Sequence, residues 1–192
     1  MKVMKQIALA VGIFATGALS AQSANMRNML KIGVNGGAST GGNTSASVGA
    51  DIAYQNLLIP GFGLGVATGY NEFFGKNKTI GGKEIKYNDF GMIPVAALLR
   101  YYPAKLGFYG GVDLGYGFIV GKNEVAKEME NAPETPNGGF YFKPEIGYHN
   151  RDWNFFVRYT KVFTGSKGQV GDVKFNVGSV GAGVAYNIPL GK

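Results

Sequence analysis

The chain has 192 residues, a length that fits one domain of ordinary size. It has no cysteine, which excludes a disulfide framework and a thiolate metal site. Its net charge of +7 comes from scattered lysines and arginines without a basic run, which argues against nucleic acid as a partner. With 32 glycines, 13% aromatic and 16% charged residues, the composition indicates an ordered chain with much apolar surface.

Residues 1–20 have the composition of a secretory signal peptide. Lys2 and Lys5 precede an apolar run over residues 7–19, and Ala18-Leu19-Ser20 satisfies the small-x-small rule for cleavage. The apolar run is shorter than the roughly 20 residues that a membrane-spanning helix needs. We therefore expect an exported chain from which residues 1–20 are removed.

Eight later segments alternate apolar and polar or small side chains with a period of two, as β-strands do. The segment 87–102 shows it best: Ile93, Val95 and Leu99 share one face, and Ala96 and Arg100 share the other. The predicted strands cover residues 28–38, 46–54, 61–73, 87–102, 107–120, 139–148, 153–163 and about 174–188. In the last strand the parity breaks over 174–179, which predicts a bulge or a late start.

The connections between these strands differ in length. Short turns are expected at 55–60, 103–106 and 149–152. The connections at 39–44, 74–86, 121–138 and 164–173 are longer on average, although the polar loop 39–44 is short. Alternating short and long connections are typical of outer-membrane barrels, which have short periplasmic turns and long outer loops.

Aromatic residues collect near the predicted strand ends, as an interfacial girdle requires. They are Tyr54, Phe62, Tyr101, Phe108, Tyr148, Trp153, Phe155 and Tyr186. The fold class predicted is therefore all-β, an eight-stranded antiparallel up-and-down transmembrane β-barrel over residues 28–190. A soluble lipocalin-like barrel with its apolar face inward is the alternative, but eight strands cannot enclose so many aromatic rings.

The chain resembles the small eight-stranded outer-membrane barrels of Gram-negative bacteria, of the OmpA/OmpX and single-domain porin-family type. The resemblance lies in the signal peptide, the stretch Ile93-Pro94-Val95 with Leu99-Arg100-Tyr101-Tyr102-Pro103, and the final strand 181–188. It implies location in the cell outer membrane after export through the periplasm, contact with outer-membrane lipid and lipopolysaccharide, and recognition of the last strand by the outer-membrane assembly machinery. It also implies a monomer.

Six ionisable residues fall on inward positions of the predicted strands, three anions and three cations. They are Asp51, Arg100, Asp113, Lys143, Glu145 and Arg158. Counted from the short turns they fall in one slab of the lumen, where unpaired charges are costly. We expect a charged network that plugs the barrel; a gate or ion-selective constriction in a narrow pore is the alternative.

The loop 74–86 is basic. Its lysines Lys76, Lys78, Lys83 and Lys86 are candidates for contact with lipopolysaccharide phosphates, and an ordinary solvated loop is the other interpretation.

Catalytic and metal-binding signals are weak. The one histidine, His149, is expected at a short turn, Ser47 lies toward the other rim, and there is no Gly-x-Ser-x-Gly elbow. We expect no cofactor, no metal and no enzyme activity, and a structural or surface-interaction role. A narrow porin-like pore is the alternative, and a lipid-modifying enzyme the third hypothesis.

Overall fold

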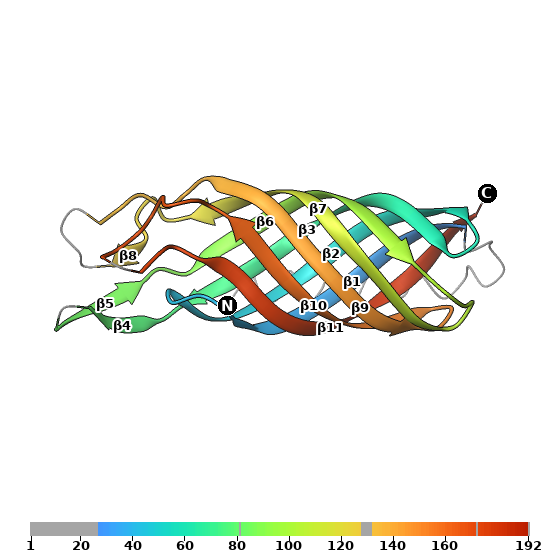
Figure 1. The fold of residues 1–192 in the computed structure, drawn as a ribbon, viewed down its shortest axis with the longest axis horizontal. Helices are drawn as coiled ribbons and strands as arrows, with labels where there is room; N and C mark the ends of the chain where they lie inside the picture. Colours follow the sequence, from blue (N-terminus) through green and yellow to red (C-terminus); the bar gives the residue numbers. More distant parts are fainter. Residues whose placement is uncertain (1–26, 81, 128–131, 172, 192) are drawn as a thin grey trace, which may run out of the picture.

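The computed structural model describes residues 27–80, 82–127, 132–171 and 173–191. The expected signal peptide, residues 1–20, lies outside them. Eight strands form one closed barrel in the order β1-β11-β10-β9-β7-β6-β3-β2, and every neighbouring pair is antiparallel. The first strand pairs with the last, which closes the barrel and leaves no free edge (Figure 1).

The barrel strands follow the predicted segments closely. They are β1 (Asn28–Ser39), β2 (Thr44–Ile59), β3 (Phe62–Gly75), β6 (Phe90–Tyr101), β7 (Gly107–Gly121), β9 (Gly138–His149), β10 (Trp153–Phe163) and β11 (Val177–Gly191). The late start of β11 agrees with the broken parity before Val177. In the described part of the chain, no helix is long and apolar enough to cross a membrane.

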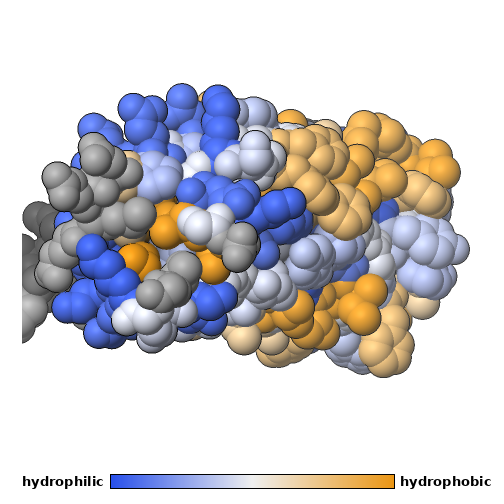
Figure 2. Space-filling view, turned by 60° about the vertical axis from the view of Figure 1, so that its left-hand side comes forward, coloured by the Kyte–Doolittle hydropathy of each residue, from blue (hydrophilic) through white to orange (hydrophobic). Residues whose placement is uncertain are grey.

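The expected outward side chains do lie on the outside of the barrel. On β6, Val95 and Tyr101 are at least half exposed, whereas Leu98 and Arg100 are buried in the lumen. On the face drawn in Figure 2, large apolar patches lie on the wall of the barrel, and hydrophilic residues gather at the end that carries the long connections. An apolar wall around an interior that contains buried charges is typical of a barrel in lipid.

One turn is shorter than the sequence predicts. Residues 55–60 were expected as a turn, but β2 continues to Ile59 and only Pro60 and Gly61 remain between the strands. Gly61 has φ of 83°, a conformation that glycine adopts without a steric penalty. The apolar residues Leu57 to Ile59 do not have the composition of a turn, so the sequence contained a signal for the longer strand.

Two of the expected loops contain strands. In 74–86, β4 (Asn77–Ile80) and β5 (Lys83–Tyr87) form a hairpin, and in 121–138 the short β8 (Ala126–Lys127) pairs with β5. This three-stranded sheet extends the barrel at the end opposite the short turns and the C-terminus (Figure 1). We refer to these ends as the outer end and the short-turn end.

Candidate functional site in the barrel lumen

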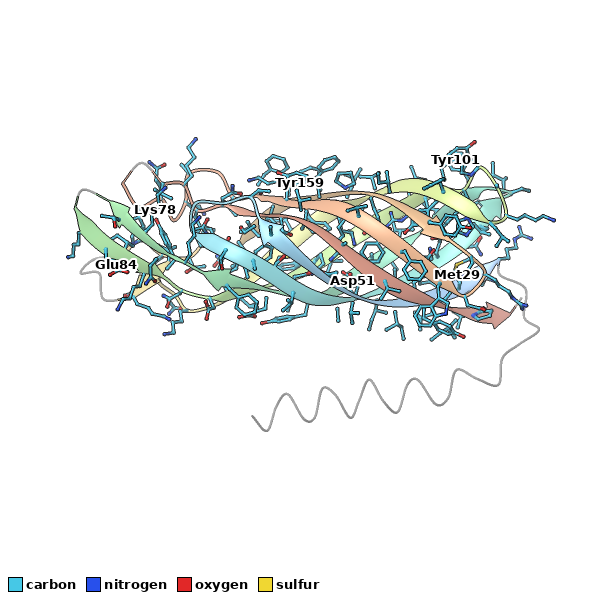
Figure 3. All side chains as sticks on the ribbon, turned by 90° about the horizontal axis from the view of Figure 1, so that it is seen from below. Met29, Asp51, Lys78, Glu84, Tyr101 and Tyr159 are labelled. Atoms are coloured by element: carbon cyan, nitrogen blue, oxygen red, sulfur yellow. The ribbon has the colours of Figure 1, made fainter. Side chains whose placement is uncertain are left out.

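The six predicted lumen charges all point inward, from five strands. Their side chains are at least 85% buried, and Asp113 is completely so. Figure 3 places Asp51 near the middle of the barrel, between Tyr101 at the short-turn end and Lys78 at the outer end.

Arg100 of β6 joins two acids from neighbouring strands. Its Nη1 donates to Oδ1 of Asp113 at 2.6 Å, and its Nη2 lies 3.4 Å from Oε1 of Glu145. The hydroxyl of Tyr109 also donates to Oε1 of Glu145, at 2.8 Å. One side of the lumen is therefore bridged by an arginine that uses both terminal nitrogens.

Lys143 of β9 connects this group to the other side of the lumen. Its Nζ lies 2.6 Å from Oδ2 of Asp113 and 4.0 Å from Oδ1 of Asp51. Arg158 of β10 then donates from Nη1 to Oδ2 of Asp51 at 2.6 Å, and Asn35 donates to the same oxygen at 3.0 Å.

The six charges thus form one chain in which the sign alternates. Its order is Glu145, Arg100, Asp113, Lys143, Asp51 and Arg158. Each anion faces a cation from another strand, so the desolvation cost of burial is offset by mutual attraction and by hydrogen bonds.

Little space is left between these side chains. The cavity among them has a volume of about 40 Å³, room for about three water molecules. Inward glycines make such filling geometrically feasible: a Cβ on Gly111 would overlap Cδ of Arg100, and one on Gly147 would lie 2.7 Å from the ring of Tyr109.

The outer part of the lumen is filled by apolar side chains, which the sequence analysis did not anticipate. Phe73 and Phe90 stack with ring centroids 5.2 Å apart, and Phe175 packs on Phe90 at 4.9 Å. The cluster continues through Met92, Ile119, Tyr141, Val162 and Val177 inside the barrel and Ile85, Tyr87, Val125, Ala126 and Val170 above it. Period-two alternation already places Met92, Tyr141 and Val162 inward. Their apolar character was therefore the sequence signal for an apolar cluster in the lumen.

One buried cation was also missed. Lys31 of β1 is 8% exposed and lies between the charged network and the short turns. Its Nζ donates to the hydroxyl of Tyr102 at 2.6 Å and lies 5.2 Å from the centre of that ring. Alternation along β1 places Lys31 inward, but closer to the short-turn end of the barrel than the other charges.

The four predicted surface lysines do not form one patch. Lys76 precedes the β4–β5 hairpin; within it, alternation puts Lys78 and Lys83 on one face and Lys86 on the other. Lys78 instead lines a groove of about 440 Å³ together with Lys161 and Lys174.

Ser47 and His149 lie at opposite ends of the barrel. Ser47 of β2 pairs with Phe73 near the outer end, and His149 of β9 pairs with Gly107 beside a short turn. No Ser–His arrangement forms between them. Among the described residues, no group of three or more His, Asp or Glu side chains is placed to hold a metal ion.

No protein-family model and no curated protein matches the chain. Solved structures with a similar architecture include two outer-membrane barrels from one organism. The outer membrane protein OprG from Pseudomonas aeruginosa is 12% identical with a TM-score of 0.51, over 88% of this chain and 99% of that one. The N-terminal β-barrel domain of OprF from the same organism is also 12% identical with a TM-score of 0.51, over 84% and 98%. The chain therefore has the eight-stranded antiparallel transmembrane fold of the small outer-membrane β-barrels.

Proposed function

We propose that the protein is a non-enzymatic outer-membrane barrel with a structural or surface-interaction role, and that its lumen is closed. The apolar wall and the polar outer end support the location. Exposed aromatic residues near both ends of the wall, such as Phe108 and Tyr148 at one end and Phe140 and Phe163 at the other, fit two interfacial belts.

The observation that carries this proposal is the filling of the lumen at two levels. The charged network leaves a cavity of about 40 Å³ between its side chains. The apolar cluster occupies the part of the lumen between the network and the outer end. A hydrated ion or a sugar would have to break several buried ion pairs and then displace packed aromatic rings. The narrow pore that the sequence left open as an alternative is therefore less favoured.

Solute flux tests the closed lumen. We expect proteoliposomes containing the refolded barrel to swell in iso-osmotic arabinose no faster than liposomes without protein. Insertion is checked by heat-modifiable gel mobility and by protease protection of the barrel strands. Swelling that rises with the amount of inserted barrel and falls with solute size would support the pore instead.

For the surface role, we propose that the groove of Lys78, Lys161 and Lys174 contacts phosphates of lipopolysaccharide. Lys161 points outward from β10 beside the exposed ring of Phe163, its Nζ 5.9 Å from the ring centre. The groove therefore lies where the apolar wall meets the outer connections, and no acidic residue in the described part of the chain lines it. Each lysine near an anionic membrane surface contributes about 1 kcal/mol of binding free energy.

Replacing Lys78, Lys161 and Lys174 by Gln should then weaken lipopolysaccharide binding by about a hundredfold, measured with the barrel in zwitterionic nanodiscs. The matched control replaces Lys83, Lys86 and Lys127, which carry the same charge on the outer sheet, and should weaken binding much less. Equal losses in the two triple variants would mean that only the overall charge matters.

A further inference from the structure

The short-turn end of the barrel contains a vestibule of about 620 Å³. It lies among the three short turns, and its walls include the apolar side chains of Met29, Leu57, Pro103 and Leu106. It opens on the side opposite the outer sheet and is separated from the outer end by the charged network. The vestibule has no part in the proposed closure of the lumen.

Lys31 lies at the inner end of the vestibule. It lines both the vestibule and the small cavity of the charged network. The network already balances three anions with three cations, so Lys31 is a surplus positive charge. Among the described residues, no carboxylate oxygen lies within ion-pair distance of its Nζ, and the hydroxyl of Tyr102 is its one hydrogen-bond acceptor. A buried ammonium in this position is costly unless an anion compensates it.

The other lining residues also favour an anion. Lys105 and Arg151 line the vestibule, and none of the described aspartates or glutamates does. His149 is 9% exposed, and its Nε2 has no hydrogen-bond partner among the described residues. Its ring packs edge-on against the ring of Tyr102, with centroids 4.8 Å apart, and Tyr102 is the residue whose hydroxyl Lys31 contacts. A cavity lined by one sign of charge focuses the field and concentrates ions of the opposite sign.

We propose that this vestibule is a binding site for a small organic anion: a phosphate, sulfonate or carboxylate head on an apolar body. The head lies against Lys31 and within reach of His149, where it neutralises the surplus charge. The body lies against the apolar walls at Met29 and Leu57. The ligand enters from the aqueous side of the short turns and does not cross the barrel.

The single histidine gives a direct probe of the site. The barrel, with ¹³C-labelled histidine, is placed in zwitterionic nanodiscs that contain no anionic lipid and is titrated with phenyl phosphate. We expect the His149 ring resonances to shift and saturate. Phenol, which has the same ring without the charge, should bind at least tenfold more weakly. Anionic lipid added to the nanodiscs at a fixed phenyl phosphate concentration shows whether a lipid headgroup competes for the same site.

Lys31→Met should weaken phenyl phosphate binding at least tenfold, while Lys83→Met, which removes an exposed lysine from the outer hairpin, should leave it unchanged. Lys31→Met removes an uncompensated charge, so we also expect it to fold at least as stably as the original chain. Absence of a saturable shift, or equal binding by phenol and phenyl phosphate, would overturn the proposal. Equal binding by Lys31→Met would do the same, and if that variant does not fold, the phenol comparison on the original chain decides.

Discussion

Asp113 lies at the centre of the charged network, with its two carboxylate oxygens facing different cations. Oδ1 accepts from Arg100 and Oδ2 lies beside Lys143, both at 2.6 Å. Strand alternation predicted that these residues point inward. Their pairing was not predictable from spacing, because it depends on barrel closure: Arg158 and Asp51 are 107 residues apart and meet across the lumen.

Asp113→Asn should destabilise the barrel by about 3–5 kcal/mol, because it leaves two buried cations short of one charge. The free energy of unfolding is measured by urea titration, with fluorescence of the single tryptophan, Trp153, as the signal. Glu84→Gln, an exposed change on the outer hairpin, is the control and should alter it by less than about 0.5 kcal/mol. A loss below 1 kcal/mol in Asp113→Asn would show that the network does not hold the lumen together.

Two adjacent glycines of β7 face opposite sides of the barrel wall. A Cβ on Gly111 would overlap Cδ of Arg100 and the carbonyl oxygen of Leu99, whereas the nearest atom to a Cβ on Gly110 is 4.0 Å away. Gly111→Ala should therefore cost about 1–3 kcal/mol through overpacking. Gly110→Ala, the matched control in the same strand, should be close to neutral in the same urea titration. Equal effects would indicate a general cost of losing glycine in β7.

The outer sheet is the element that sequence patterns did not reveal. The β4–β5 hairpin is rich in lysine and glycine and has only short strands, so its composition is that of a loop. Its order comes from tertiary packing: Ile85 and Tyr87 are nearly fully buried in the outer apolar cluster. A prediction based on local alternation has no access to contacts of this kind.

Ile85→Asn should detach this hairpin without opening the barrel. It replaces a buried apolar contact with an amide, at a cost of about 2 kcal/mol or more, so amide hydrogen exchange in β4 and β5 should rise at least tenfold. Exchange in the centre of β6 should stay unchanged, because the barrel ladder does not depend on the hairpin. Glu84→Gln on the same strand is again the control. Faster exchange in β6 as well would mean that the hairpin and the barrel unfold as one unit.

At the scale of the whole molecule, the sequence predicted the strand number, the inward and outward faces and the closed antiparallel order. These features follow from the repeated alternation of apolar and polar side chains. A one-residue shift in the register of a strand would exchange its inward and outward faces. The division of the interior into a charged level and an apolar level was not predicted, because alternation tells which side of the wall a residue faces and not which inward side chains pack together.

Trp153 reports how the barrel lies in a membrane. It is 44% exposed on the wall near the short-turn end and packs against Tyr186 with ring centroids 4.9 Å apart. In bilayers with brominated lipids, its fluorescence should be quenched more by bromine near the headgroup than by bromine near the chain end. Strongest quenching by the deep bromine would place this belt at the bilayer centre and contradict the orientation.

The central claim is that the lumen is closed to ions, and single-channel recording in a planar bilayer tests it most directly. We predict no discrete conductance steps for the folded, heat-modifiable barrel, because an ion that crosses the lumen would have to separate the ion pairs of the network and displace the packed side chains of the apolar cluster. Discrete openings whose size or ion selectivity changes in Arg100→Ala would contradict this account and make the lumen charges the constriction of a pore.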